Sequence, residues 1–193
     1  MCGIAGFFGF EDKELIKNML DSLYHRGPDD HGIFTDKDAS IGNRRLSIID
    51  VSGGHQPMHN EDETVFVVFN GAIYNFPELK EELEKNGHRF YSNCDTEVLV
   101  HLYEEYGEEF PKKLLGMFSF AIWDSVKKKA VLSIDPAGKK PLHYFFDKGI
   151  LLFASEIKSL LNYKKIKVEL DGVSLNYLLN LQFIPYKRTL LRI

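Results

Sequence analysis

Cys2 directly follows the initiator methionine, and this position makes its thiol the first candidate for catalysis in the sequence. Removal of Met1 would place a thiol and a free α-amine on one residue. Reference pKa values of about 8.5 for the thiol and about 7.7–8.0 for the amine allow both groups to exchange protons near neutral pH. A nucleophile activated by a terminal amine is an established form of covalent catalysis. We therefore predict an N-terminal cysteine nucleophile, with a passive cysteine on an ordinary first strand as the alternative.

A cysteine nucleophile also needs donors that stabilise the oxyanion formed when it attacks a carbonyl group. The dipeptide Asn70-Gly71 follows a β-branched and aromatic run, and it offers a side-chain amide and an unobstructed backbone N–H. Donors of this kind, placed where charge develops, are worth about 2.7–4 kcal/mol each. A tight turn is the alternative, because Asn-Gly is a common turn sequence.

Arg45 and Asp95 carry the two charges that an α-amino acid substrate requires. The Arg45 guanidinium could hold a carboxylate through two N–H groups. The Asp95 carboxylate, at the start of a helical pattern, could accept a substrate ammonium. The alternatives are an exposed salt bridge for Arg45 and a helix cap for Asp95.

The seven histidines show no metal-type spacing, and the terminal amine makes a histidine base unnecessary. We expect no metal site.

Composition sets the class of protein. The 193 residues can bury a core, and 44% hydrophobic with 27% charged residues is ordinary for a globular domain. A net charge of -4 favours neither nucleic acid nor an anionic membrane as a partner. We find no bilayer-spanning apolar run and no basic leader. Cys2 and Cys94 lack CxxC spacing, which argues against a disulfide framework or a zinc site. We expect a cytoplasmic protein with reduced thiols.

The elements that must position these residues are many short strands around two central helices. Strands are predicted near residues 3–8, 64–69, 118–124, 130–134, 142–146 and 151–154. Helices are predicted near residues 11–24, 75–87, 95–106, 156–161 and 173–181. This order predicts an α+β domain rich in antiparallel pairs, and not a βαβ nucleotide binder.

Eight motifs occur in order along the chain: CGIAG (2–6), HRGPDD (25–30), RLSIID (45–50), GGHQP (53–57), NGAIYN (70–75), CDTEV (94–98), GMFSFA (116–121) and ASEIK (154–158). Together they resemble the glutaminase domain of glutamine-hydrolysing asparagine synthetases, within the class II glutamine amidotransferases. The resemblance covers nearly the whole chain. It identifies the chain as a member of that class.

The resemblance implies a four-layer αββα N-terminal-nucleophile hydrolase fold, with two stacked, mainly antiparallel sheets between helices. The domain would span 2–182, and 183–193 would begin a linker to a synthetase domain. It further implies that the Cys2 thiolate attacks the side-chain amide of L-glutamine. The Cys2 amine then carries the proton to departing ammonia, Asn70 and Gly71 stabilise the oxyanion, and a glutamyl thioester is hydrolysed.

The resemblance also assigns the substrate contacts. Arg45 would hold the glutamine carboxylate and Asp95 its ammonium, while backbone from Ile48 and Ile49 lines the pocket. Ala72 stands where the family usually has a glutamate that helps to bind the ammonium. Loss of a hydrogen bond to a charged group costs about 1.5–3 kcal/mol, roughly 10- to 150-fold in affinity. We expect weak glutamine binding with the oxyanion donors intact.

A second departure from the family concerns the loop 134–142, where Ile134 replaces an arginine and Ala137 is small. These changes affect either the packing of this loop or its docking on a synthetase partner. The third concerns Met1, because a chain that keeps it carries its amine on the wrong residue.

The family's synthetase domain uses ATP and magnesium to amidate an acceptor carboxylate, so we expect no cofactor in this domain. The chain would be either a truncated protein or a stand-alone subunit that serves such a partner, and a homodimer is conceivable. Two other functions stay open. One is hydrolysis of a different amide, with Ala72 opening the pocket. The other is a degenerate, non-catalytic interaction or regulatory module.

Overall fold

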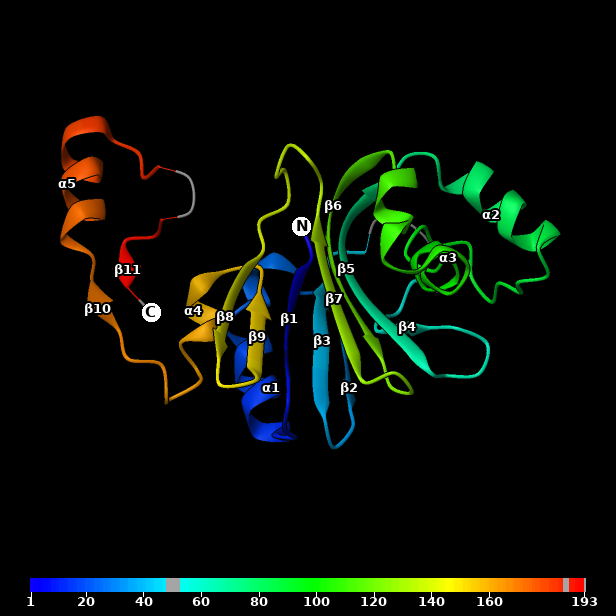
Figure 1. Cartoon of the computed structure of the whole chain (residues 1–193), viewed down its shortest axis with the longest axis horizontal. Helices are drawn as coiled ribbons and strands as arrows, with labels where there is room; N and C mark the ends of the chain where they lie inside the picture. The colour runs from blue at the N-terminus through cyan, green and yellow to red at the C-terminus, as the bar shows by residue number, and fades with distance from the viewer. Residues whose placement is uncertain (48–52, 186–187, 193) are drawn as a thin grey trace. The chain divides into compact units, whose positions relative to one another are not determined.

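Residues 1–47, 53–185 and 188–192 are described by the computed structural model, which divides the chain into two units, Met1–Asn162 and Tyr163–Ile193 (Figure 1). The first unit contains both main sheets and every candidate site residue that is described. Within the described ranges, each helix is too short or too polar to cross a membrane.

The N-terminal run of small apolar residues forms β1 (Gly3–Phe8), which is buried along its whole length. It lies in the middle of a five-stranded sheet of order β2-β3-β1-β9-β8. It pairs antiparallel with β3 (Ala39–Arg45) on one side and with β9 (Ile150–Ala154) on the other. The outer strands are β2 (Asp30–Thr35), which pairs with β3, and β8 (His143–Asp147), which pairs with β9. A Cβ at Gly6 would lie 2.6 Å from the Ser40 carbonyl oxygen, so glycine is required for this close strand approach.

The second sheet has four antiparallel strands in the order β4-β5-β6-β7. They are β4 (Met58–His59), β5 (Val65–Ile73), β6 (Gly116–Asp124) and β7 (Lys129–Ile134). The prediction that the β5 strand stops at Asn70-Gly71 was wrong, and so was the tight-turn alternative. Gly71 pairs with Phe118 inside the ladder, and a Cβ there would lie 2.2 Å from the Met117 carbonyl oxygen. Glycine here allows close packing and not a turn.

The two sheets pack face to face, because alternate residues of each strand present an apolar surface to the other sheet. Ile4 of β1 and Ile41 of β3 share a buried cluster with Val68 of β5 and Trp123 of β6. A second cluster joins the other face of β5 and β6 to the helices α2 (Phe76–Lys85) and α3 (Val98–Tyr106).

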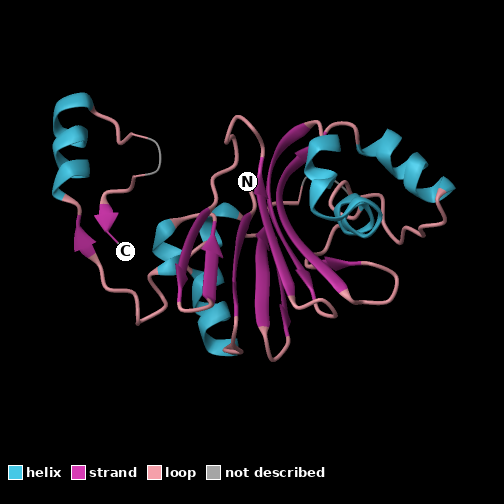
Figure 2. Cartoon of the chain, viewed as in Figure 1, coloured by secondary structure: helices cyan, strands magenta, loops and turns pink. Residues whose placement is uncertain are grey.

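The helices α1 (Lys13–Asp21) and α4 (Ile157–Leu160) contact strands of the first sheet. Figure 2 shows these helices on one side of the paired sheets and α2 with α3 on the other. The short 3-10 segments η1 (Tyr24–Arg26) and η2 (Gly107–Lys113) complete this unit. The predicted α+β architecture, with two stacked antiparallel sheets between helices, is confirmed.

The second unit contains α5 (Gly172–Leu181), preceded by β10 (Glu169–Leu170) and followed by β11 (Leu191–Arg192), which pairs with β10. Asp171 caps α5 by accepting a hydrogen bond from the Ser174 backbone N–H at 3.2 Å. The domain boundary placed at 182 stays a prediction.

Candidate functional site

Cys2 lies immediately before β1, half-buried, with its Sγ 3.8 Å from the Leu46 carbonyl oxygen. Because Gly3 pairs with Arg44, continuing the two strands by one residue brings Cys2 level with Arg45. The strand ladder therefore fixes the position of the thiol beside the end of β3. Both cysteines are free.

A half-buried arginine, Arg26, anchors the backbone at Cys2. Arg26 Nε donates to the Cys2 carbonyl oxygen at 3.0 Å, and its Nη1 donates to Glu156 at 3.0 Å. Glu156 also contacts His25 Nε2 at 2.8 Å and Lys158 Nζ at 3.2 Å. Burial raises the pKa of the Glu156 carboxyl, but hydrogen bonds from these three partners outweigh burial and hold that pKa at about 2.

Sequence reasoning gave Arg26 and Glu156 no role. The two residues are 130 positions apart, and only the fold brings them together. The available signal was that each belongs to one of the eight family motifs, at 25–30 and 154–158.

Asn70 lies within β5 and is 1% exposed. Its Nδ2 has no hydrogen-bond partner among the residues that the structure describes. Side chains alternate along a strand, so Asn70 and Ala72 share the face of Val68, which packs between the sheets. By the same alternation Cys2 lies on the face of Ile4, and β1 contacts β5. The amide and the thiol therefore belong to facing surfaces of the two sheets.

An unpaired buried donor costs about 1–3 kcal/mol, so the Asn70 amide is suited to a ligand atom that accepts its hydrogen bond. The second predicted donor, the Gly71 N–H, lies next to it in the same strand. Its role as an oxyanion donor stays a prediction.

Asp95 is 3% exposed, and its Oδ2 accepts a hydrogen bond from the Ile73 N–H at 2.9 Å. This bond places the carboxylate at the end of β5, beside Ala72. The helix-cap alternative was wrong, because α3 begins at Val98 with Glu97 in the cap position. Burial raises the pKa of the Asp95 carboxyl despite its hydrogen bonds. A cationic ligand would offset the cost of burying this charge.

Arg45 ends β3 and is 5% exposed, so the alternative of an exposed salt bridge was wrong. Across the ladder Arg45 pairs with Asp30. Burial raises the pKa of the Asp30 carboxyl, but hydrogen bonds from His55 and the His31 N–H, together with the charges of His55 and Arg45, outweigh burial and lower that pKa. The two other predicted pocket residues, Ile48 and Ile49, lie outside the described residues.

Gln56 links the two sides of the predicted pocket, and sequence reasoning gave it no role. Its Oε1 accepts from the Phe69 N–H at 2.7 Å, directly before Asn70. Its Nε2 lies 3.4 Å from Thr96 Oγ1, directly after Asp95. Gln56 is buried, and its position in the GGHQP motif at 53–57 was the only signal in the sequence.

The loop that departs from the family pattern is closed around Asp135. This carboxylate accepts hydrogen bonds from the N–H groups of Phe118 at 3.1 Å, Ala137 at 3.0 Å and Lys139 at 3.1 Å. These bonds lower its pKa although burial opposes them. Ile134 points into solvent at 43% exposure, so loop packing does not depend on an arginine there.

The family model and the curated relatives that match this chain agree on one family. A family model described as a glutamine amidotransferase domain matches residues 1–193. Asparagine synthetase [glutamine-hydrolyzing] 1 of Bacillus subtilis is 44% identical over 197 residues, which cover 98% of this chain and 31% of that protein. The corresponding enzyme of Zea mays is 43% identical over 83% of this chain and 28% of its own length. The chain spans less than a third of these curated relatives.

Two solved structures share the fold. A structure described as the allosteric regulatory enzyme of purine biosynthesis superposes with a TM-score of 0.71 at 24% identity, over 83% of this chain and 43% of that one. Glutamine phosphoribosylpyrophosphate amidotransferase from B. subtilis gives a TM-score of 0.68 at 23% identity, over 82% and 43% of the two chains.

Proposed function

The chain belongs to the glutamine amidotransferase family, and we propose that it hydrolyses the side-chain amide of L-glutamine with Cys2 as the nucleophile. The observation that supports this most directly is that the Cys2 thiol and the Asn70 amide lie on facing surfaces of the two sheets. A half-buried thiol is anchored at the start of β1, and the unpartnered Asn70 amide lies on the opposing face of β5.

The chemistry follows from these groups once Met1 is removed. The Cys2 amine takes the thiol proton, and the thiolate attacks the amide carbon. The Asn70 Nδ2 donates to the developing oxyanion. Collapse of the tetrahedral intermediate breaks the C–N bond, and the amine gives its proton to departing ammonia. Water then cleaves the thioester, which releases glutamate and restores the thiol.

Arg45 and Asp95 are proposed to hold the charged ends of glutamine. Both are buried: Arg45 ends β3 of the first sheet, and Asp95 lies in the turn before α3, beside the end of β5 in the second sheet. Ala72, next to the Ile73 that bonds Asp95, supplies no further charge. This arrangement supports a substrate that carries both a free carboxylate and an ammonium. The ammonium would be bound more weakly than in a pocket with a second carboxylate at position 72.

The ammonia acceptor is proposed from the relatives, which are named asparagine synthetases and are about three times as long as this chain. A synthetase domain or subunit would consume the ammonia with ATP and magnesium. Those cofactors belong to that partner and not to this domain. A cytoplasmic location and a homodimer stay predictions.

Intact mass after treatment with a diazoketone analogue of glutamine tests the proposal. We expect a chain without Met1 to gain one covalent adduct, and peptide mapping to place it on Cys2 and not on Cys94. Cys2→Ala should abolish both the adduct and ammonia release while preserving the thermal unfolding midpoint. A processed, folded chain that forms no adduct at saturating analogue would contradict the proposal.

A further inference from the structure

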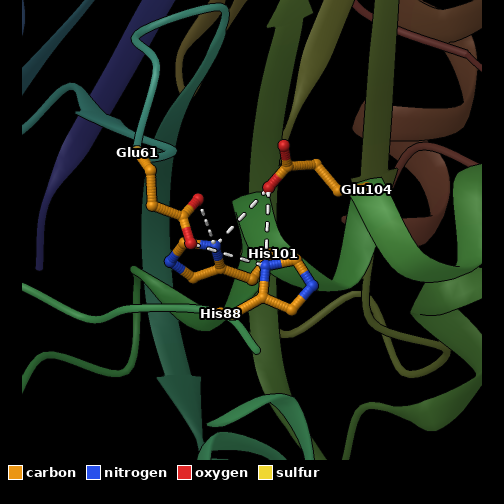
Figure 3. A group of neighbouring side chains, drawn as sticks. All are labelled: Glu61, His88, His101 and Glu104. Atoms are coloured by element: carbon orange, nitrogen blue, oxygen red, sulfur yellow. Dashed lines mark ion pairs between the residues drawn. The ribbon is translucent and has the colours of Figure 1, made fainter. Parts of the chain in front are cut away.

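Four side chains that play no part in the proposed glutamine chemistry converge at one place on the first unit. Glu61 follows β4, His88 follows α2, and His101 and Glu104 lie three residues apart on α3. Figure 3 shows the four side chains pointing toward one another. One ligand atom from each residue lies within 4.8 Å of the other three.

The spacing of these atoms is too wide for hydrogen bonds. His101 Nδ1 lies 3.4 Å from Glu61 Oε2 and 3.5 Å from Glu104 Oε2. His88 Nδ1 lies 3.7 Å from Glu61 Oε1 and 3.9 Å from Glu104 Oε2. Hydrogen bonds between such atoms span about 2.7–3.2 Å. Ligands about 2.0–2.2 Å from a tetrahedral zinc ion are about 3.3–3.6 Å apart, so the two His101 distances match this spacing and the two His88 distances are slightly longer.

His101 provides an independent observation. Its side chain is 0% exposed, and neither ring nitrogen has a hydrogen-bond partner within the part of the chain that the structure describes. Ion pairs with Glu61, Glu97 and Glu104 at 3.4–3.7 Å compensate for burying this imidazole, but these contacts are longer than hydrogen bonds. Its Nδ1 faces the two carboxylates, where a bound cation would accept its lone pair.

Groups behind the two carboxylate ligands hold their orientation. Glu104 Oε1 accepts from Asn60 Nδ2 at 2.7 Å, which leaves Oε2 facing the cluster. Glu61 Oε1 accepts from the Arg89 N–H at 2.8 Å. Outer contacts of this kind fix metal ligands and are usual in metal sites.

The far nitrogen of the buried imidazole also has an anionic neighbour. His101 Nε2 lies 3.7 Å from the buried carboxylate of Glu97. That carboxylate is fixed by the N–H groups of Tyr91 at 2.7 Å and Ser92 at 2.8 Å. A carboxylate on this side of a metal-ligating histidine is a usual outer partner, and here it lies as an ion pair beyond hydrogen-bond distance.

We propose that Glu61, His88, His101 and Glu104 form a zinc site. Two neutral imidazoles and two carboxylates make a tetrahedral N2O2 set, and the two negative charges balance one divalent cation. The site would fasten the segment after β4 and the segment after α2 to α3. Its role is structural, and it does not depend on glutamine hydrolysis.

Zinc binding to the whole chain tests the inference, in a Cys2→Ala background that removes the accessible thiol as a competing ligand. Equilibrium dialysis with metal analysis should find one zinc per chain. Glu61→Gln/Glu104→Gln should lower zinc affinity by at least about 100-fold, since changes behind the ligands already cost about 10- to 100-fold. Both side chains are partly exposed, so this variant should fold.

Glu81→Gln/Glu109→Gln is the matched control, because it removes the same charge from exposed positions outside the cluster. It should bind zinc as the parent does. Cobalt should give the visible absorption of a four-coordinate site without a thiolate charge-transfer band. Equal zinc affinity in the two double variants, no zinc in the parent, or a thiolate band would each overturn the inference.

Discussion

The buried side-chain nitrogen of Asn70 has no partner among the described residues, so its replacement isolates the oxyanion contribution. We expect Asn70→Ala to lower kcat by about 100- to 1,000-fold, because it removes one preorganised donor. The KM for glutamine should change little, since the donor acts on charge that appears only in the transition state.

Steady-state ammonia release measures this effect. Asn86→Ala, which changes an exposed asparagine at the end of α2, is the matched control and should keep full activity. A loss that appears only in KM would assign Asn70 to substrate binding and not to the oxyanion.

Ala72 allows a gain-of-function test at the same face of β5. A glutamate at this position would place a second carboxylate near Asp95, where the substrate ammonium is expected. Ala72→Glu should lower the KM for glutamine by about 10- to 150-fold, the value of one hydrogen bond to a charged group.

Ala72→Gln has nearly the same volume without the charge and should not reproduce the gain. N-acetylglutamine, which has no ammonium, should show no benefit from Ala72→Glu. If Ala72→Glu lowered the KM of both substrates equally, the gain would not come from binding of the ammonium by Asp95 and residue 72.

At the scale of single residues, the sequence indicated candidate residues for the chemistry, whose roles stay predictions, but not the residues that hold those candidates in place. Cys2, Asn70 and Asp95 could be selected because their chemistry is visible in the residue type. Arg26 and Gln56 could not, because an arginine and a glutamine in polar loops acquire a role only through contacts with distant strands.

The segment that carries Cys2 is connected to α4 through Arg26 and Glu156, and this connection gives a pH prediction. Glu156 has an ordinary pKa of 4.5 and a folded pKa of about 2. A lowered pKa means that the stabilisation is complete above pH 4.5 and is lost as pH falls toward 2. Glu156→Gln should cost about 1–2 kcal/mol at pH 7, reduced from the full shift by partial solvent exposure.

Urea unfolding at pH 7 and at pH 3 measures this prediction. The difference between the parent and Glu156→Gln should shrink at the lower pH, because at pH 3 Glu156 is protonated in the unfolded parent while it is still largely charged in the folded parent. Glu169→Gln, in β10 and exposed, is the control. A difference that stays constant with pH would mean that Glu156 acts through packing and not through its charge.

Element boundaries were the part of the fold that local sequence patterns predicted least well. The Asn-Gly dipeptide indicated the end of a strand, yet β5 continues to Ile73 because β6 supplies a partner for every residue. Asp12 caps α1 as a local pattern predicts, by accepting hydrogen bonds from Glu14 and Leu15. Asn75 instead bonds the distant Leu115 N–H, which no local pattern contains.

For the whole molecule, the order of strands and helices predicted an α+β domain rich in antiparallel pairs, and the layer order came from the family resemblance. The cluster around His101 was not predictable. Its ligands come from three separated segments, and only His101 and Glu104 have helical spacing. The expectation of no metal site considered the spacing of histidines and of cysteines, and not the carboxylates that folding brings to the histidines.

The extent of the folded domain is the prediction that belongs to the whole chain. The sequence placed the end of the domain at 182, whereas internal contacts divide the chain after Asn162. Ser159 and Leu160 of α4 are fully buried, and Ser159 Oγ donates to the Met19 carbonyl oxygen at 2.9 Å, so a cut before 162 would expose the core.

We therefore expect a chain of residues 1–162 to keep the unfolding free energy of residues 1–182 within about 0.5 kcal/mol, as is usual for changes outside a packed core. Glutamine hydrolysis should persist too, because every described site residue precedes 162. Urea unfolding and ammonia release of the two shortened chains measure both expectations. If residues 1–162 failed to fold while residues 1–182 folded, α5 would be part of the domain, and the boundary indicated by the sequence would hold.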